Sequence, residues 1–218
     1  MEKNQNPLSS LNEEIARRHD YFFLCVDGVG GKGKTVMLTM LAVFLHENYN
    51  KVYANFELIG IPNFERLPKK LNKHIILSLK PNSLILLTEA YIYFDCRECM
   101  KTKNIDTTHS LFQARKKGFD IFFDIPSFKY TELRLKEWTK LVVRARGKRD
   151  NTKEGENIFG YDICSYLPDY DMLQTHRIRK QFNMKNIFKR FKSFEVIDYE
   201  PTLETFMKEN QKEKKKKF

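Results

Sequence analysis

The glycine-rich sequence GVGGKGKT, from Gly28 to Thr35, is the strongest indication of the fold class. It follows Tyr21 to Val26, an apolar run typical of a buried strand, and it opens Lys34 to Glu47, where apolar residues recur at helical spacing. A glycine-rich turn between a strand and a helix lets backbone N–H groups point at phosphate oxygens, and the helix N-terminus adds the positive end of its dipole. The stretch fits G-x-x-x-x-G-K-[ST], the Walker A or P-loop pattern.

This pattern predicts ATP and Mg²⁺ as ligands. Lys34 is expected to reach the β- and γ-phosphates, and the hydroxyl of Thr35 is expected to bind Mg²⁺. The same letters also contain G-x-G-x-x-G, a dinucleotide fingerprint, but that motif has no use for a Lys-Thr pair, so the P-loop is favoured. The predicted nucleotide-binding residues are Gly28, Gly30, Gly31, Lys32, Gly33, Lys34, Thr35 and Val36.

A second apolar run, Leu84 to Leu87, ends in Thr88 and Glu89. P-loop ATPases place acids at the end of such a strand, one for Mg²⁺ and one to polarise the attacking water. Glu89 is therefore predicted to be the catalytic acid, although an ordinary exposed acid at a helix start is the alternative. Thr88 occupies the metal-binding position without a charge, so Mg²⁺ is expected to rely on Thr35 and Thr88. Asp27 and Asp95 are candidate helpers.

The elements alternate along the chain, which predicts an α/β fold with a mostly parallel sheet covered by helices on both faces. The further predicted strands are Val52–Leu58, Ile75–Leu79, Ser83–Leu87, Phe119–Phe123 and Leu141–Arg146, and the further predicted helices are Thr107–Lys117 and Tyr130–Lys136. After Gly147 the pattern changes to extended segments, Ile158–Tyr166 and Phe194–Tyr199, around the basic stretch Arg177–Lys192. We expect an N-terminal helical extension (1–20), one P-loop domain with a C-terminal elaboration (21–206) and a basic disordered tail (207–218).

Composition limits the classes of ligand, metal site and cellular location that the chain is expected to have. The formal net charge of +11 favours a polyanionic partner, although part of it lies in the lysine-rich tail. Cys96 and Cys99 form a C-x-x-C pair, but no second pair follows, so reduced thiols are favoured over a metal site. The longest apolar stretches are too short for a transmembrane helix and no signal peptide opens the chain, so a soluble, cytoplasmic protein is expected.

The order of these segments resembles the FtsK–HerA superfamily of P-loop ATPases, and within it the small archaeal and viral members and the Zot-like proteins of filamentous phages. The resemblance rests on the Walker A stretch, Asn55, "LILLTEAYIYFDCR", "HSLFQARKKGFDIFF", "FKYTELRLKEWTKLVVR" and "FEVIDYEP". It implies that Arg115 is an arginine finger acting on a neighbouring subunit. The chain departs from the family at Thr88, where an acid is usual, and after Phe123, where Thr-Gln is replaced by "DIPSF".

Family membership would imply a homo-oligomeric motor, most commonly a hexameric ring, that moves double-stranded DNA without reading its sequence. Viral genome packaging is the leading expectation, with a capsid or portal-like protein as a further partner. The alternatives are a Zot-like ATPase for virion morphogenesis or extrusion, and a nucleotide-gated DNA-binding protein with little hydrolysis. The predicted DNA-contacting residues are Lys116, Lys117, Arg144, Arg146, Lys148 and Arg149.

Overall fold

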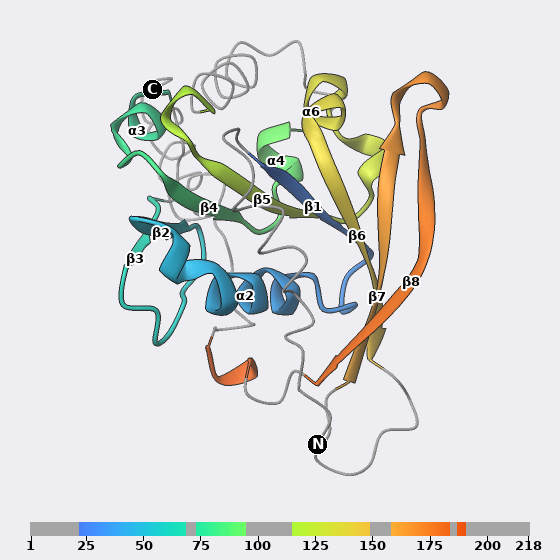
Figure 1. Cartoon of the computed structure of the whole chain (residues 1–218), viewed down its shortest axis with the longest axis horizontal. Coiled ribbons are helices and arrows are strands. Elements are labelled where there is room, and N and C mark those ends of the chain that lie inside the picture. Colours follow the sequence, from blue (N-terminus) through green and yellow to red (C-terminus); the bar gives the residue numbers. More distant parts are fainter. Residues whose placement is uncertain (1–21, 69–72, 95–114, 149–157, 184–186, 191–218) are drawn as a thin grey trace, which may run out of the picture.

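The chain folds around one eight-stranded sheet with the order β3-β2-β4-β5-β1-β6-β7-β8 (Figure 1). This computed structural model describes residues 22–68, 73–94, 115–148, 158–183 and 187–190. The strands are β1 (Phe23–Asp27), β2 (Lys51–Ala54), β3 (Phe64–Arg66), β4 (Ser83–Leu87), β5 (Asp120–Ile125), β6 (Thr139–Lys148), β7 (Ile158–Leu167) and β8 (Met172–Asn183). The strands from β3 to β6 in this order pair in parallel, and β6, β7 and β8 pair antiparallel.

Helices cover both faces of the sheet (Figure 1). The α-helices are α2 (Lys34–Leu45), α3 (Lys73–Ser78), α4 (Tyr91–Phe94) and α6 (Leu133–Trp138). The 3-10 turns are η1 (His46–Asn48), η3 (Arg115–Lys117), η4 (Phe128–Tyr130), η5 (Pro168–Tyr170) and η6 (Phe188–Arg190). The predicted α/β fold is therefore confirmed, with a mostly parallel sheet between two helical layers.

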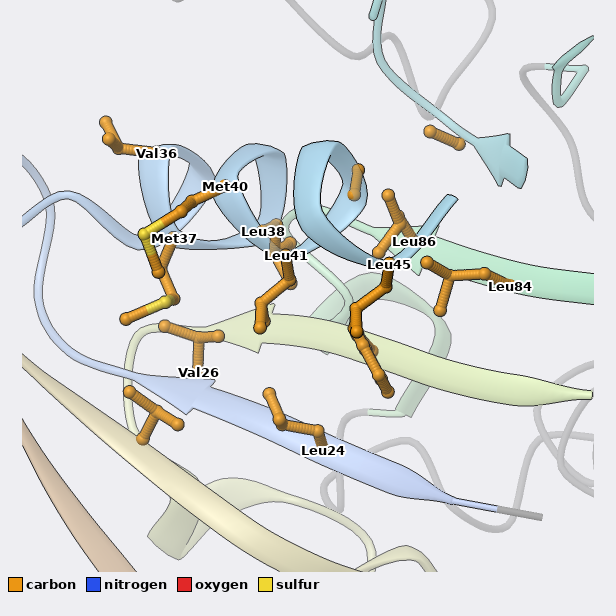
Figure 2. Close-up of a cluster of buried hydrophobic side chains, with 14 of the residues drawn as sticks. Leu24, Val26, Val36, Met37, Leu38, Met40, Leu41, Leu45, Leu84 and Leu86 are labelled. Carbon is orange, nitrogen blue, oxygen red and sulfur yellow. The ribbon is translucent and has the colours of Figure 1, made fainter. Parts of the chain in front are cut away.

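The hydrophobic core has two parts, one on each face of the sheet, because successive strand residues point to opposite faces. Figure 2 shows the first part, in which α2 packs its buried face onto Leu24 and Val26 of β1 and Leu84 and Leu86 of β4. The second part lies on the other face and includes Phe23 and Cys25 of β1. Burial of each large apolar side chain contributes about 1.5–3 kcal/mol, so this packing holds α2 firmly against β1 and β4.

One predicted strand is wrong. Ile75–Leu79 is not extended; it lies in α3 and in the turn that follows it. Ile76 and Leu79 are the buried positions, and their spacing of three residues is helical rather than alternating. A short apolar run does not distinguish a buried strand from a buried helix, which explains the error.

The C-terminal elaboration is a β-meander that extends the sheet beyond β6. The predicted segment Ile158–Tyr166 is β7, and part of the basic stretch Arg177–Lys192 forms the second half of β8. The predicted segment Phe194–Tyr199, the N-terminal extension, most of Thr107–Lys117 and the basic tail lie outside the described residues.

Candidate nucleotide-binding site

The P-loop lies at the carboxyl end of β1, between its neighbours β5 and β6. The backbone N–H of Gly28 donates to the carbonyl of Ile125, at 3.2 Å, which joins the start of the loop to the end of β5. Gly31 and Gly33 have φ values of +74° and +86°, in the left-handed region that favours glycine. The two glycines therefore allow the tight turn that a phosphate-binding loop needs before the N-terminus of α2.

Two aromatic side chains of β7 support this loop from outside. A Cβ at Gly33 would lie 2.6 Å from Cδ1 of Phe159, so there is no space for a side chain there. The hydroxyl of Tyr161 donates to the carbonyl of Gly33, at 3.0 Å, and burial raises the pKa of Tyr161, which keeps this donor protonated. The antiparallel extension of the sheet thus fixes the shape of the P-loop.

Lys34 and Thr35 begin α2, and both are partly exposed. The ammonium of Lys34 lies 3.5 Å from the carbonyl of Val29, which places it over the loop. Its positive charge also lowers the pKa of Asp124, a buried carboxyl on β5 whose pKa is raised above its ordinary value mainly by burial. Lys34 therefore lies within electrostatic reach of the Asp124 carboxyl on β5.

Three side-chain oxygens meet beside the start of α2. The hydroxyls of Thr35 and Thr88 are 3.2 Å apart, and the carboxylate oxygen Oδ2 of Asp124 accepts hydrogen bonds from Thr88 at 2.7 Å and from Thr35 at 3.4 Å. Neighbouring oxygens in an octahedral Mg²⁺ shell are about 2.9 Å apart, and Mg²⁺ prefers such hard oxygen donors. The donor set and its dimensions therefore fit Mg²⁺.

Asp124 is the residue of this group that the sequence reasoning missed. It is the first residue of "DIPSF", the segment that stands where the family has Thr-Gln, and it lies buried one residue before the end of β5. The signal was present, because "IFFD" places an acid after a buried run just as "LILLTE" does. Asp124 was overlooked because the adjacency of β4 and β5 is not visible in the sequence.

Glu89 is held in a strained backbone conformation. Its φ is +52°, which is rare for a residue with a side chain and costs on the order of 1–3 kcal/mol. Its N–H donates to Oδ1 of Asp124 at 2.9 Å, and the N–H of Ala90 donates to the Asp124 carbonyl at 2.9 Å. The Glu89 side chain is exposed, so its carboxylate is accessible from the P-loop edge of the sheet.

Asn55 fixes the backbone of Thr88. Its side-chain amide donates to the Thr88 carbonyl and its Oδ1 accepts from the Thr88 N–H, both at 2.9 Å and both buried. Asn55 is one of the positions on which the family resemblance rests, but the sequence alone predicted no role for it. The paired contact holds the Thr88 hydroxyl toward Thr35 and Asp124.

Asp27 does not join this group of oxygens, contrary to the suggestion that it helps to bind Mg²⁺. Its carboxylate accepts from the N–H of Phe128 at 2.9 Å and from Nε of Arg144 at 3.1 Å. Asp27 and Arg144 line a separate pocket of about 230 Å³ together with Lys136 and Tyr166. Asp95, the other suggested helper, lies outside the described residues.

The predicted DNA-contacting residues divide between the two ends of the parallel strands. Lys116 and Lys117 precede β5, so they lie at its amino end, and Lys117 donates to the carbonyl of Leu77. Arg144, Arg146 and Lys148 lie toward the carboxyl end of β6, beyond the positions paired with the middle of β1. The structure therefore does not bring the two groups together.

Two of these cations are already ion-paired. Arg144 contacts Asp27, and Arg146 contacts Asp162 at 2.5 Å. Arg146 and Lys148 are exposed, while Arg149 lies outside the described residues. Because β6 continues through Lys148, Arg144, Arg146 and Lys148 are strand residues and do not lie on a loop.

The backbone of Arg115 lies in η3, also at the amino end of β5. The P-loop follows the carboxyl end of β1, which pairs with β5 in parallel. The five residues of β1 span about 17 Å at ~3.3 Å per residue, so the two positions are at opposite edges of the sheet.

Among the described residues, no group of three or more His, Cys, Asp or Glu side chains forms a metal cluster. Cys25 and Cys164 are buried free thiols, and Cys96 and Cys99 lie outside the described residues. In the described part of the chain, no helix has both the length and the apolar character that a membrane crossing requires.

Comparison with protein-family models gives no match, and comparison with curated proteins gives none either. Among solved structures, the fold is similar to the N-terminal domain of zonular occludens toxin from Neisseria meningitidis, with a TM-score of 0.55 and 14% identity over 79% of this chain and 100% of that one. The genome packaging NTPase B204 from Sulfolobus turreted icosahedral virus 2 gives 0.48 and 9% over 73% and 98%. The flagellar accessory protein FlaH from Methanocaldococcus jannaschii gives 0.45 and 12% over 80% and 98%. Taken with the P-loop, the first of these likenesses shows that the chain has the fold of a P-loop NTPase.

Proposed function

We propose that the protein binds ATP with Mg²⁺ and hydrolyses it. The observation that carries this proposal is the convergence of the P-loop with Thr35, Thr88, Asp124 and Glu89 at one edge of the sheet. A bare glycine turn would not need two hydroxyls, a buried carboxylate and a strained acid beside it.

Each residue has a chemical task in this proposal. Lys34 and the amides at the start of α2 bind the phosphates, and the hydroxyls of Thr35 and Thr88 hold Mg²⁺, which neutralises phosphate charge when it is bound. The exposed carboxylate of Glu89 orients the attacking water. The backbone amides of Gly30, Gly31 and Gly33 complete the phosphate cradle, whereas that of Gly28 donates to the carbonyl of Ile125.

We further propose that the active form is a homo-oligomeric ring. Arg115 lies about one strand length from the P-loop of its own chain, so it is better placed to serve the nucleotide of a neighbouring subunit. An arginine finger contributes about 10³–10⁵-fold to turnover in related chemistry. Mixing Arg115→Ala subunits with Glu89→Gln subunits tests this, because shared sites would regain activity that neither variant has alone.

The proposed substrate is double-stranded DNA, moved during viral genome packaging with a capsid or portal-like partner. The net charge of +11 and the exposed Lys116, Arg146 and Lys148 support contact with phosphates. Arg144 and Arg146 form ion pairs with carboxylates, which reduces the electrostatic contribution that these two residues can make to DNA binding. We therefore assign the larger electrostatic contribution to the exposed Lys116 and Lys148.

A Zot-like role in virion morphogenesis is the second candidate. It is favoured by the fold similarity to the N-terminal domain of zonular occludens toxin. In that case ATP hydrolysis would not respond to DNA.

The rate of ATP hydrolysis, measured with and without double-stranded DNA, separates these functions. A packaging motor should hydrolyse ATP faster with DNA of any sequence, and the effect should weaken as salt rises. Hydrolysis that ignores DNA would favour the morphogenesis role. ATP binding without turnover would support the nucleotide-gated DNA-binding alternative, and no nucleotide binding would refute the proposal as a whole.

A further inference from the structure

Thr88 leaves the end of β4 without the negative charge that a Mg²⁺–ATP site requires. The last paired positions of β4 and β5 are Leu87 and Phe123, so Thr88 and Asp124 come next on the two parallel strands. Their side chains meet, with 2.7 Å between the Thr88 hydroxyl and Oδ2 of Asp124. A carboxylate therefore lies one strand away from the position where an acid was expected.

The two oxygens of Asp124 have separate partners. Oδ2 faces the hydroxyls of Thr88 and Thr35, and Oδ1 accepts from the N–H of Glu89. Asp124 is only 1% exposed, so a charge there is expensive unless positive groups or donors surround it. Thr35 and Lys34, which supply that environment, both belong to the P-loop. This couples Asp124 to the nucleotide site as well as to the turn after β4.

We propose that Asp124 supplies the carboxylate of the Mg²⁺ site, so that acid and hydroxyl are transposed between β4 and β5. Thr88 on β4 provides the hydroxyl, and Asp124 on β5 provides the charge. Asp124 also positions Glu89 through Oδ1, which makes it a positioning residue for the catalytic acid. This inference rests on the proposed nucleotide function.

If Asp124 supplies the carboxylate of the metal site, replacing it should weaken metal binding. Asp124→Asn keeps the size of the side chain and an oxygen for the Glu89 N–H, but it removes the charge. We expect Mn²⁺ affinity in the presence of ADP to fall by about 10–100-fold, the range typical of residues that support a metal site. ADP binding in EDTA should change little, because the phosphate contacts of Lys34 and the α2 amides remain.

Asp120→Asn is the matched control, because Asp120 is also a buried acid on β5. It lies at the opposite end of the strand, where it accepts from the N–H of Phe22 and from the hydroxyl of Tyr49, each at 2.6 Å. Mn²⁺ affinity measured by electron paramagnetic resonance should stay at the wild-type value in this variant. A general effect of neutralising a buried carboxylate would lower it in both variants.

The double variant Thr88→Asp/Asp124→Thr tests the exchange itself. It returns the acid to β4 and the hydroxyl to β5, and it should recover most of the Mn²⁺ affinity lost in Asp124→Asn. Thr88→Asp alone places two carboxylates in contact, so the metal-free protein should melt at a lower temperature than wild type. If the double variant does not fold, the comparison of Asp124→Asn with Asp120→Asn still decides the question.

Failure of the inference differs from failure of the proposed function. Wild-type protein that binds no ADP in EDTA or with Mn²⁺ would remove the nucleotide site. Wild-type protein that binds Mn²⁺–ADP, together with Asp124→Asn that binds Mn²⁺ equally well, would leave the nucleotide site intact and show that Asp124 is only structural.

Discussion

Gly33→Ala should destabilise the protein more than Gly31→Ala, although both replace a glycine with positive φ in the P-loop. The added methyl group costs about 1–2 kcal/mol at either position, because the left-handed region is unfavourable for a residue with Cβ. At Gly33 the methyl would also lie 2.6 Å from Phe159, and overpacking of this kind costs about 1–3 kcal/mol more. At Gly31 nothing lies within 4 Å. We therefore expect losses of about 2–5 kcal/mol and about 1–2 kcal/mol, respectively.

The assay is urea denaturation without nucleotide, so that lost ligand contacts do not contribute. Phe159→Leu is the second arm, because a smaller side chain on β7 should recover part of the extra loss when it is combined with Gly33→Ala. Equal free energies of unfolding for Gly31→Ala and Gly33→Ala would show that β7 does not support the loop. The same conclusion would follow if Phe159→Leu brought no recovery.

Three further predictions concern buried polar groups. Tyr161→Phe removes the donor to the Gly33 carbonyl and should cost about 1 kcal/mol in urea denaturation, with a loosened P-loop visible as faster amide exchange. Asn55→Ala leaves the N–H and carbonyl of Thr88 unpaired, at about 1–3 kcal/mol for each group, and an unchanged melting temperature would contradict this role. Burial raises the pKa of Asp120 to about 6, so its contribution to stability is full below pH ~4 and is lost as pH rises through 6. The fall in unfolding free energy between pH 4 and pH 7 should therefore be smaller in Asp120→Asn, by up to about 3 kcal/mol, and an identical fall in both proteins would refute the assignment.

The sequence predicted the elements whose signals are local. A glycine turn before Lys34 and Thr35 predicts the loop and the start of α2, and the run before Thr88 predicts β4 with its observed bounds. These elements depend on residues close together in the chain. The α3 helix was mistaken for a strand because its apolar run is too short for its periodicity to show.

The rest of the site depends on which strands are neighbours. Asp124 becomes part of the site because β5 lies beside β4, and Phe159 reaches Gly33 because β7 follows β6 at the other side of β1. Neither pairing is encoded by local spacing. The contact of Arg144 also depends on tertiary structure. Its positive charge predicted contact with DNA, but in the structure its guanidinium contacts Asp27.

Calorimetric titration of ATP into wild type and Lys34→Ala in EDTA measures whether the P-loop binds the phosphates of ATP. Lys34 contributes a charge-assisted contact worth about 1.5–3 kcal/mol, so we expect an affinity at least about tenfold lower in the variant. The Asp120→Asn variant should bind as wild type does. Equal ATP affinity in wild type and Lys34→Ala, or no binding to either, would show that the P-loop does not bind these phosphates.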